Sequence, residues 1–226
     1  MTTVDADPAA VDIELSRTAL LLIDMQRDFL EPGGFGDALG NDVGLLADCI
    51  APCQALLEAA REAGVLVIHT REGHRTDLSD VHGTKQERCA MGKRIGDAGP
   101  MGRILVRGEP GHALVDALAP LPGEPVVDKP GKGAFFATDL DLLLRRAGID
   151  NLLVCGVTTE VCVSSTVREA SDRGYRVVVP GDCCASYFPA FHDAALAMIS
   201  AQGGIFGVVT EGATLVAALR HSTSAP

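Results

Sequence analysis

Three residues of different chemical types follow short apolar runs of the chain, and together they could perform nucleophilic chemistry. Asp24 and Lys129 each close an apolar run, and Cys162 follows another run, residues 151–156, after a short turn. A cysteine thiolate can attack a carbonyl carbon, a carboxylate can remove the thiol proton, and an ammonium group can stabilise the charges. Cys162 falls in the first turn of a predicted helix, where the helix dipole and free backbone N–H groups are expected to lower the pKa of a thiol. The residue types predict a nucleophile, a base and an electrostatic partner.

The cysteines as a set favour neither a disulfide framework nor a zinc site. They stand at positions 49, 53, 89, 155, 162, 183 and 184. Their number is odd, and the chain is not a short secreted one. Cys49 and Cys53 have the spacing of zinc ligands, but no second half follows. Most of these thiols are expected to be small buried apolar groups. A redox protein that pairs Cys162 with Cys155, or uses the pair 183–184, stays an alternative.

Strand and helix patterns alternate about six times, which predicts an α/β fold with a mostly parallel sheet and helices on both faces. A continuous apolar run such as Thr18–Asp24 is typical of a strand that is buried on both faces. Functional residues of such folds gather at the carboxyl ends of the strands. Strands are expected at 18–24, 65–70, 125–129, 151–156, 176–180 and 205–210, with a short one near 104–107. Helices are expected at 42–63, 111–118, 139–147, 161–173 and 189–202, with a last one that ends at about Leu219.

The charge and the composition exclude several classes of protein. The 226 residues include 30 acidic and 19 basic side chains, a net charge of −11, and no Trp. Such a chain lacks the basic footprint and the stacking platforms of a nucleic-acid binder, and its charge disfavours an anionic membrane surface. No apolar run approaches the roughly 18 residues of a membrane span, and the first residues do not resemble a secretory signal. We expect a cytoplasmic protein with a single domain over residues 1–226, in which 1–15 and 221–226 are peripheral tails.

Three motifs in this order resemble the isochorismatase-like superfamily of hydrolases, and the resemblance covers residues 18–218. The motifs are LIDMQRDF with Asp24, DKPGKGAF with Lys129, and GVTTEVC with Cys162. Within the superfamily the chain is most similar to the biuret and triuret hydrolases. This further similarity rests on HTREGHR at 69–75, RILVRGEPG at 103–111 and QGGIFG at 202–207.

The resemblance implies a fold, an assembly and an activity. It implies a three-layer Rossmann-like fold with a six-stranded sheet, usually a homotetramer, that acts without a metal or another cofactor. It implies a cysteine amidohydrolase that cleaves a C–N bond of biuret or triuret and releases ammonia through a thioester. Isochorismatases proper lack the nucleophilic cysteine. Metal-binding nicotinamidases carry an Asp and two His after the first strand, whereas no His lies between Asp24 and Gly64. Alternatives are N-carbamoylsarcosine, ureidoacrylate or nicotinamide as the substrate, and a catalytically idle binding module.

The resemblance also implies roles for single residues. Asp24 takes the proton of Cys162, and Lys129 holds Asp24 and stabilises the ion pair. The backbone N–H groups of Thr158 and Cys162 form the oxyanion hole, with a cis peptide bond between Val157 and Thr158.

Four further residues are candidates for contact with the substrate. Phe29 follows the first strand and could form a wall of the pocket. Lys132 and Arg71 could each donate a hydrogen bond to a distal carbonyl group. Gln202 precedes a strand, at the wrong end of its own sheet, and is expected to reach an active site across a subunit interface or through a bent connection.

Overall fold

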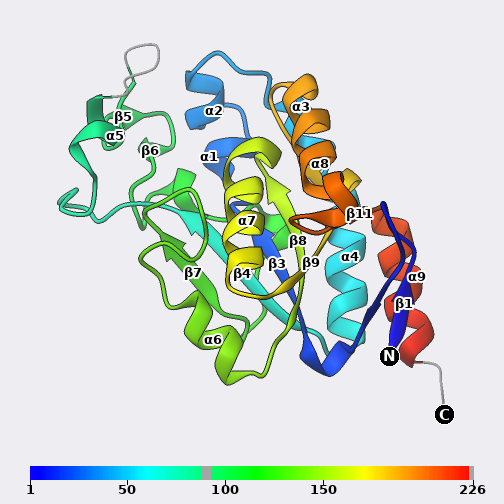
Figure 1. Ribbon diagram of the computed structural model, residues 1–226. Coiled ribbons are helices and arrows are strands. Elements are labelled where there is room, and N and C mark those ends of the chain that lie inside the picture. Colours follow the sequence, from blue (N-terminus) through cyan, green and yellow to red (C-terminus); the bar gives the residue numbers. More distant parts are fainter. Residues whose placement is uncertain (88–92, 224–226) are drawn as a thin grey trace.

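The computed structural model describes residues 1–87 and 93–223, and a sheet of seven parallel strands forms its centre (Figure 1). Six strands have the order β11-β9-β8-β3-β4-β7, and the short β10 pairs with β8. The expected parallel α/β fold is confirmed. The expected number of six strands is wrong because β10 adds a seventh. The strands are β3 (Thr18–Ile23), β4 (Leu66–Glu72), β7 (Val126–Lys129), β8 (Asn151–Val157), β9 (Arg176–Pro180), β10 (Cys184–Ala185) and β11 (Val208–Thr210).

Helices cover both faces of this sheet. On one side α4 (Ile50–Glu62) packs against α9 (Gly212–Thr223), and on the other side lie α6 (Leu140–Arg146) and α7 (Ser164–Asp172) (Figure 1). The central strand β3 is buried along its whole length, as its continuous apolar run predicts. The remaining helices are α1 (Arg27–Leu30), α2 (Phe35–Ala38), α3 (Gly44–Ala47), α5 (Gly83–Glu87) and α8 (Pro189–Gly204).

The helix expected over residues 42–63 is interrupted. It consists of α3 and α4, which are separated by Asp48 and Cys49. Pro52 explains why one continuous helix does not form, since proline has no N–H group and its ring clashes in a helix interior. With α4 starting at Ile50, Pro52 lies in the first turn, where this N–H group has no partner in any case.

Two other expected elements differ because long-range backbone contacts override local preference. The segment 111–118 forms no α-helix. Leu114 forms an isolated β-bridge with Gln26, and the Val115 N–H donates to Met25 O at 2.9 Å. No strand forms at 104–107, where an isolated bridge joins Val106 to His74. Both segments belong to the connection between β4 and β7, and they pair with residues that follow β3 and β4.

The two chain ends are more ordered than expected. The predicted tail 1–15 contains an antiparallel hairpin of β1 (Thr2–Val4) and β2 (Val11–Ile13), in which Val4 and Ile13 are completely buried. At the other end α9 continues to Thr223, so the expected tail begins later. Residues 224–226, like Cys89, lie outside the described residues.

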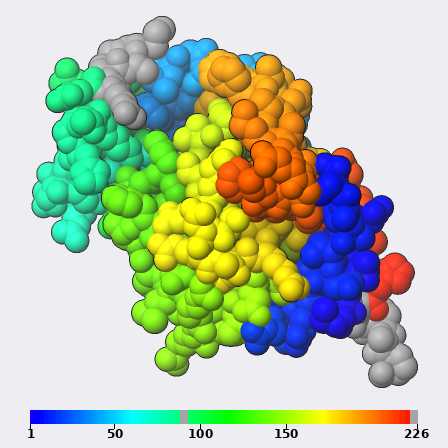
Figure 2. Space-filling view, viewed as in Figure 1, coloured from blue at the N-terminus to red at the C-terminus, as the bar shows by residue number. Residues whose placement is uncertain are grey.

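The connection between β4 and β7 forms a lobe at one end of the molecule (Figure 2). It contains α5 and the short hairpin of β5 (Ala98–Gly99) and β6 (Gly102–Arg103). The lobe has its own small apolar cluster of Ile95, Ile104 and Leu105. Within the described part of the chain, no helix is both long and apolar enough to cross a membrane.

Candidate active site

Asp24 and Lys129 form a completely buried ion pair at the carboxyl edge of the sheet. Asp24 follows β3 and Lys129 ends β7, and Lys129 Nζ lies 2.7 Å from Asp24 Oδ2. The hydroxyl group of Thr70 donates to Asp24 Oδ1 at 2.7 Å and fixes the carboxylate. Burial alone would lower the pKa of Lys129, but Asp24, Cys162 and Glu72 together raise it above its usual range, so the ammonium group stays charged.

Cys162 lies beside this pair. Lys129 Nζ donates to Cys162 Sγ at 3.4 Å, and also to the carbonyl oxygens of Gly131 at 3.0 Å and Lys132 at 2.9 Å. In the sheet β8 and β4 flank β3, and β7 lies next to β4, which brings Cys162, Asp24 and Lys129 to the same edge. The structure thus unites the aspartate, the lysine and the cysteine that the sequence singles out.

The expectation of a lowered thiol pKa is wrong. Cys162 does not open α7; it lies in a single π-helical turn, Thr159–Val163, that precedes this helix. Its side chain is buried, and burial raises the pKa of the thiol more than the nearby charge of Lys129 lowers it. Cys162 is therefore a protonated thiol at neutral pH and needs a base before it can act as a nucleophile.

The chain immediately before this turn approaches β3 closely. The peptide bond between Val157 and Thr158 is cis, as the resemblance implies. Gly156 has a φ of +116°, and a Cβ atom at this position would lie 2.1 Å from the carbonyl oxygen of Ile23. Only glycine permits this approach, which places the turn with Cys162 next to the residue that follows Ile23.

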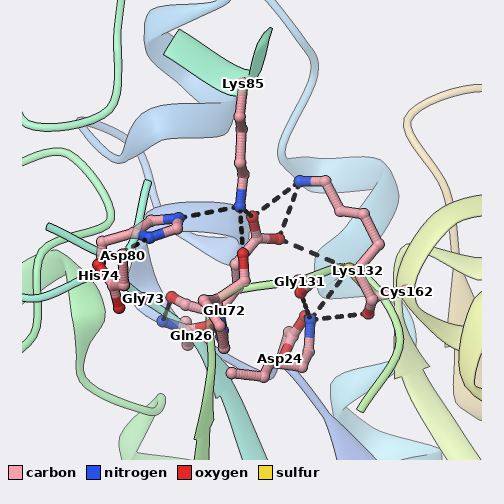
Figure 3. A network of polar contacts seen from close by, with 12 residues as sticks. Asp24, Gln26, Glu72, Gly73, His74, Asp80, Lys85, Gly131, Lys132 and Cys162 are labelled. Carbon is pink, nitrogen blue, oxygen red and sulfur yellow. Dashed lines mark hydrogen bonds and ion pairs between the residues drawn. The ribbon is translucent and has the colours of Figure 1, made fainter. Parts of the chain in front are cut away.

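Glu72 is a second buried carboxylate at the site, which the sequence reasoning missed (Figure 3). It ends β4, and its Oε2 lies 3.7 Å from Cys162 Sγ. Although burial raises the pKa of Glu72, the ammonium groups of Lys132, Lys129 and Lys85 lower it well below its usual range. The signal was available in the sequence, because Glu72 lies two residues beyond the expected strand 65–70.

Two further lysines neutralise Glu72. Lys132 Nζ contacts both of its oxygens, at 2.8 and 3.0 Å, and Lys85 Nζ donates to Oε1 at 2.7 Å. Lys85 comes from α5 and also contacts His74 Nε2 at 2.9 Å, so it joins the lobe to the site (Figure 3).

The four expected substrate contacts have different outcomes. Lys132 belongs to the cluster, and its side chain is 47% exposed. Arg71 does not: it binds Asp128 through two hydrogen bonds, of 2.7 and 3.1 Å, because strand alternation turns it away from the face that bears Glu72. Phe29 is half-buried in α1 and packs against both apolar clusters.

Gln202 is exposed, in a kink of α8 where its φ is +53°. Among the described residues, no contact joins it to the cluster around Cys162, so its predicted role depends on a second subunit.

Asp24, Glu72 and Cys162 place possible ligand atoms within 4.8 Å of one another. The chemistry of the surroundings opposes a metal cation there, because the ammonium groups of Lys129 and Lys132 contact the same atoms. This donor set fits the reactions of a thiol better than the coordination of a metal.

The other described cysteines are buried and unpaired by disulfides. Four of them donate to backbone carbonyl oxygens: Cys49 to Leu46 and Cys53 to Cys183, each at 3.1 Å, Cys155 to Leu21 at 3.7 Å, and Cys184 to Val154 at 4.0 Å. These contacts agree with a packing role.

Comparisons with known proteins place the chain in a family. The family model described as the isochorismatase domain matches residues 18–213. A cysteine hydrolase from Pseudomonas syringae pv. phaseolicola 1448A has 32% identity and a TM-score of 0.79, over 93% of this chain and 95% of that one. An isochorismatase family protein from Desulfovibrio vulgaris subsp. vulgaris str. Hildenborough has 31% identity and a TM-score of 0.74, over 92% and 99%.

The N-carbamoylsarcosine amidase from Thermoplasma acidophilum shares the fold, with 22% identity and a TM-score of 0.66 over 87% of this chain and 96% of that one. The family match covers most of the chain, and the cysteine hydrolase aligns along nearly its full length. The chain belongs to the isochorismatase family and is one of its cysteine hydrolases.

Proposed function

We propose that this chain is an amidohydrolase that cleaves a C–N bond of a small linear urea-type amide, biuret or triuret, and releases ammonia. The observation that carries the proposal is the buried arrangement of Asp24, Lys129 and Cys162, with contacts of 2.7 and 3.4 Å. The amidase from Thermoplasma acidophilum, whose name describes the hydrolysis of a carbamoyl compound, supports this class of reaction through its shared fold. The choice of biuret or triuret rests on the sequence motifs.

In the first step the thiol is activated. Asp24 Oδ2 is held by the ion pair with Lys129 and, within the described residues, accepts no further hydrogen bond, so it has room for a proton. Asp24 takes the S–H proton of Cys162, and the sulfur forms a bond to a carbonyl carbon of the substrate. Lys129 stays charged and stabilises the thiolate that forms.

The tetrahedral intermediate then collapses. Its oxyanion accepts hydrogen bonds from the backbone N–H groups of Thr158 and Cys162. The C–N bond breaks, the leaving nitrogen takes the proton from Asp24, and ammonia departs. A thioester on Cys162 remains. Asp24 removes a proton from water, the hydroxide attacks the thioester, and the acid product leaves as the sulfur regains its proton.

Substrate contacts and assembly complete the proposal. Lys132 donates to a distal carbonyl group of the substrate, and Phe29 forms a wall of the pocket. The chain assembles into a homotetramer in which Gln202 reaches the active site of a second copy. The exposure of Gln202 supports this placement, because its side chain is available to another subunit.

The test is ammonia release from biuret, triuret, N-carbamoylsarcosine, ureidoacrylate and nicotinamide. Cys162→Ser should abolish release from the preferred substrate. Cys49→Ser is the matched control, because Cys49 is equally buried and donates to a backbone carbonyl oxygen that a serine can also reach. Release from another member of the panel would keep the chemistry and change the substrate. No release from any of them, or an active Cys162→Ser variant, would contradict the proposal and favour a binding module.

A further inference from the structure

Glu72 is the polar group at the centre of the site for which the proposed reaction has no task. Its side chain is 1% exposed and lies between Lys85, Lys132 and Cys162 (Figure 3). Its backbone is fixed by Gln26, whose Oε1 accepts the Glu72 N–H at 2.7 Å and whose Nε2 donates to Glu72 O at 3.0 Å. These contacts fix the position of the Glu72 carboxylate relative to the sulfur of Cys162.

The acceptor positions of this carboxylate can be counted. Each carboxylate oxygen accepts about two hydrogen bonds. Oε1 accepts Lys85 at 2.7 Å and Lys132 at 2.8 Å, so it is fully used. Oε2 accepts Lys132 at 3.0 Å and the S–H group of Cys162 at 3.7 Å. When Cys162 loses its proton, one acceptor position of Oε2 becomes free beside the attacking sulfur.

Glu72 is a poor candidate for the base itself. Three ammonium groups surround it and lower its pKa, so it binds a proton weakly. Among the described residues, Asp24 has one ion-pair partner, Lys129. The two carboxylates therefore have different tasks: Asp24 moves the proton, and Glu72 stays an anion that accepts hydrogen bonds throughout the reaction.

The positions around the attacked carbon determine what Glu72 meets. Asp24 protonates the leaving nitrogen, so that nitrogen faces Asp24. The oxyanion faces the N–H groups of Thr158 and Cys162. A carboxylate oxygen of Glu72 lies within 4.8 Å of both Cys162 Sγ and a carboxylate oxygen of Asp24, so the remaining substituent of the carbon lies next to Glu72. In biuret and triuret this substituent is an internal N–H group.

We propose that Glu72 is a specificity-determining residue, whose Oε2 accepts the internal N–H group of the substrate after Cys162 has given up its proton. This inference rests on the proposed function. The site therefore selects ureido compounds that carry a hydrogen on the nitrogen next to the attacked carbonyl group. A substrate with a methyl group on this nitrogen leaves a buried carboxylate oxygen without a donor, which is costly.

The first experiment compares biuret with 3-methylbiuret, which lacks the internal N–H group and keeps both carbonyl groups. The wild-type chain should prefer biuret in kcat/KM by about 10- to 100-fold, as expected for a hydrogen bond to a charged group. In Glu72→Gln the preference should fall to within about threefold, since the glutamine retains the shape but has lost the anionic acceptor. The variant also weakens the contact between Lys132 and residue 72, but this affects both substrates alike. The ratio of their kcat/KM values therefore reports only the contact with the internal N–H group.

Controls keep the outcomes separate. Glu124→Gln is the matched variant, because Glu124 also lies in a partly buried ion-pair cluster, with Arg61 and His69, at the opposite end of β7. It should keep the wild-type ratio. Circular dichroism checks that Glu72→Gln is folded, and Glu72→Asp, which keeps the anion, should retain a preference for biuret. A ratio that stays at the wild-type value in folded Glu72→Gln overturns the inference, because a steric effect of the methyl group would persist there.

A second measurement needs no substrate. The extent of alkylation of Cys162 by iodoacetamide, measured by peptide mass spectrometry across pH, reports the fraction of the thiol that is ionised. Removing the anion that accepts the S–H group should move the midpoint of alkylation to lower pH in Glu72→Gln but not in Glu124→Gln. An unchanged midpoint overturns the contact on which the inference depends.

The two proposals can fail separately. If the wild-type chain hydrolyses neither biuret nor triuret, the proposed function and the inference are both overturned. If it hydrolyses biuret, and Glu72→Gln keeps the same ratio of kcat/KM for biuret over 3-methylbiuret as Glu124→Gln, the inference alone is overturned.

Discussion

Glu72 and Lys129 are paired in register across β4 and β7, and both side chains reach Cys162. The preceding pair of the same register, Arg71 and Asp128, forms its own salt bridge. Strand alternation separates the two pairs: one contributes opposite charges to the nucleophile, and the other is a separate ion pair. The consequences can be measured.

The buried ion pair between Asp24 and Lys129 should be costly to break on one side. Lys129→Met leaves a buried carboxylate without its partner, so the free energy of unfolding should fall by about 3–5 kcal/mol. Adding Asp24→Asn removes the unpaired charge and should restore much of this stability, while activity stays absent. Urea unfolding monitored by circular dichroism measures both variants. Arg17→Met is the control, since Arg17 and Asp150 are about half exposed and should contribute less than about 1 kcal/mol.

The double variant decides the interpretation of this experiment. If it is as unstable as Lys129→Met alone, packing of the lysine side chain, and not the unpaired charge of Asp24, accounts for the loss.

Lys132 and Arg71 should differ in their effect on the substrate. Lys132→Met removes an ammonium group beside Glu72 and a proposed substrate donor, so KM for the preferred ureido substrate should rise at least about tenfold. Arg71→Met breaks a salt bridge with Asp128 and should leave KM within about twofold, since this pair is partly exposed. Initial rates over a range of substrate concentrations measure both. A large rise of KM in Arg71→Met would show that Arg71 contacts the substrate after all, against the argument from strand alternation.

His112 should make stability fall in mild acid. Burial, and then the positive charge of Arg71, lower the pKa of His112 to about 4, from an ordinary value of 6.5. The unfolded chain binds a proton below pH 6.5, whereas the folded chain does so near pH 4, so stability is full above pH 6.5 and declines as the pH falls toward 4. Thermal unfolding between pH 7 and 5 should show this decline, and His112→Gln should reduce it. An equal decline in the variant would assign the effect to other groups, such as His69 and His74, whose pKa values burial also lowers.

Gln202 should act between subunits. The proposed tetramer predicts that native mass spectrometry detects four copies, and that Gln202→Ala raises KM of the preferred substrate. A mixture of Gln202→Ala with Cys162→Ser, unfolded and refolded together, should recover activity, because some sites then combine an intact Cys162 with an intact Gln202 of another copy. A refolded mixture with no more activity than Gln202→Ala alone would place Gln202 outside the site.

The fold and the three reactive residues followed from local sequence patterns, whereas Glu72 did not. Continuous apolar runs mark strands that are buried on both faces, and these strands end where Asp24, Lys129 and Cys162 begin the site. The second strand was expected to end at residue 70, but it continues to Glu72. Neighbouring residues of a strand point to opposite faces, so the choice of Arg71 in place of Glu72 put the expected substrate contact on the wrong face.

Other differences arose where distant contacts decide the local structure. The segment 111–118 has a helical pattern, yet its backbone pairs with Met25 and Gln26, which no local pattern shows. The thiol pKa was expected to be low from the helix dipole and the free backbone N–H groups of the first turn. Burial is the larger effect, and it depends on the whole sheet around Cys162.

The adjacency of β3 and β8 has a consequence for the newly made chain. Asp24 and Cys162 are more than 130 residues apart in the sequence, and register pairs along these two strands, such as Leu20 with Leu153, bring them together. Contacts between such distant residues form late, because a long loop has to close first. During synthesis Asp24 is therefore added to the chain long before Cys162, and a chain that has not yet paired these two strands has no assembled reactive centre.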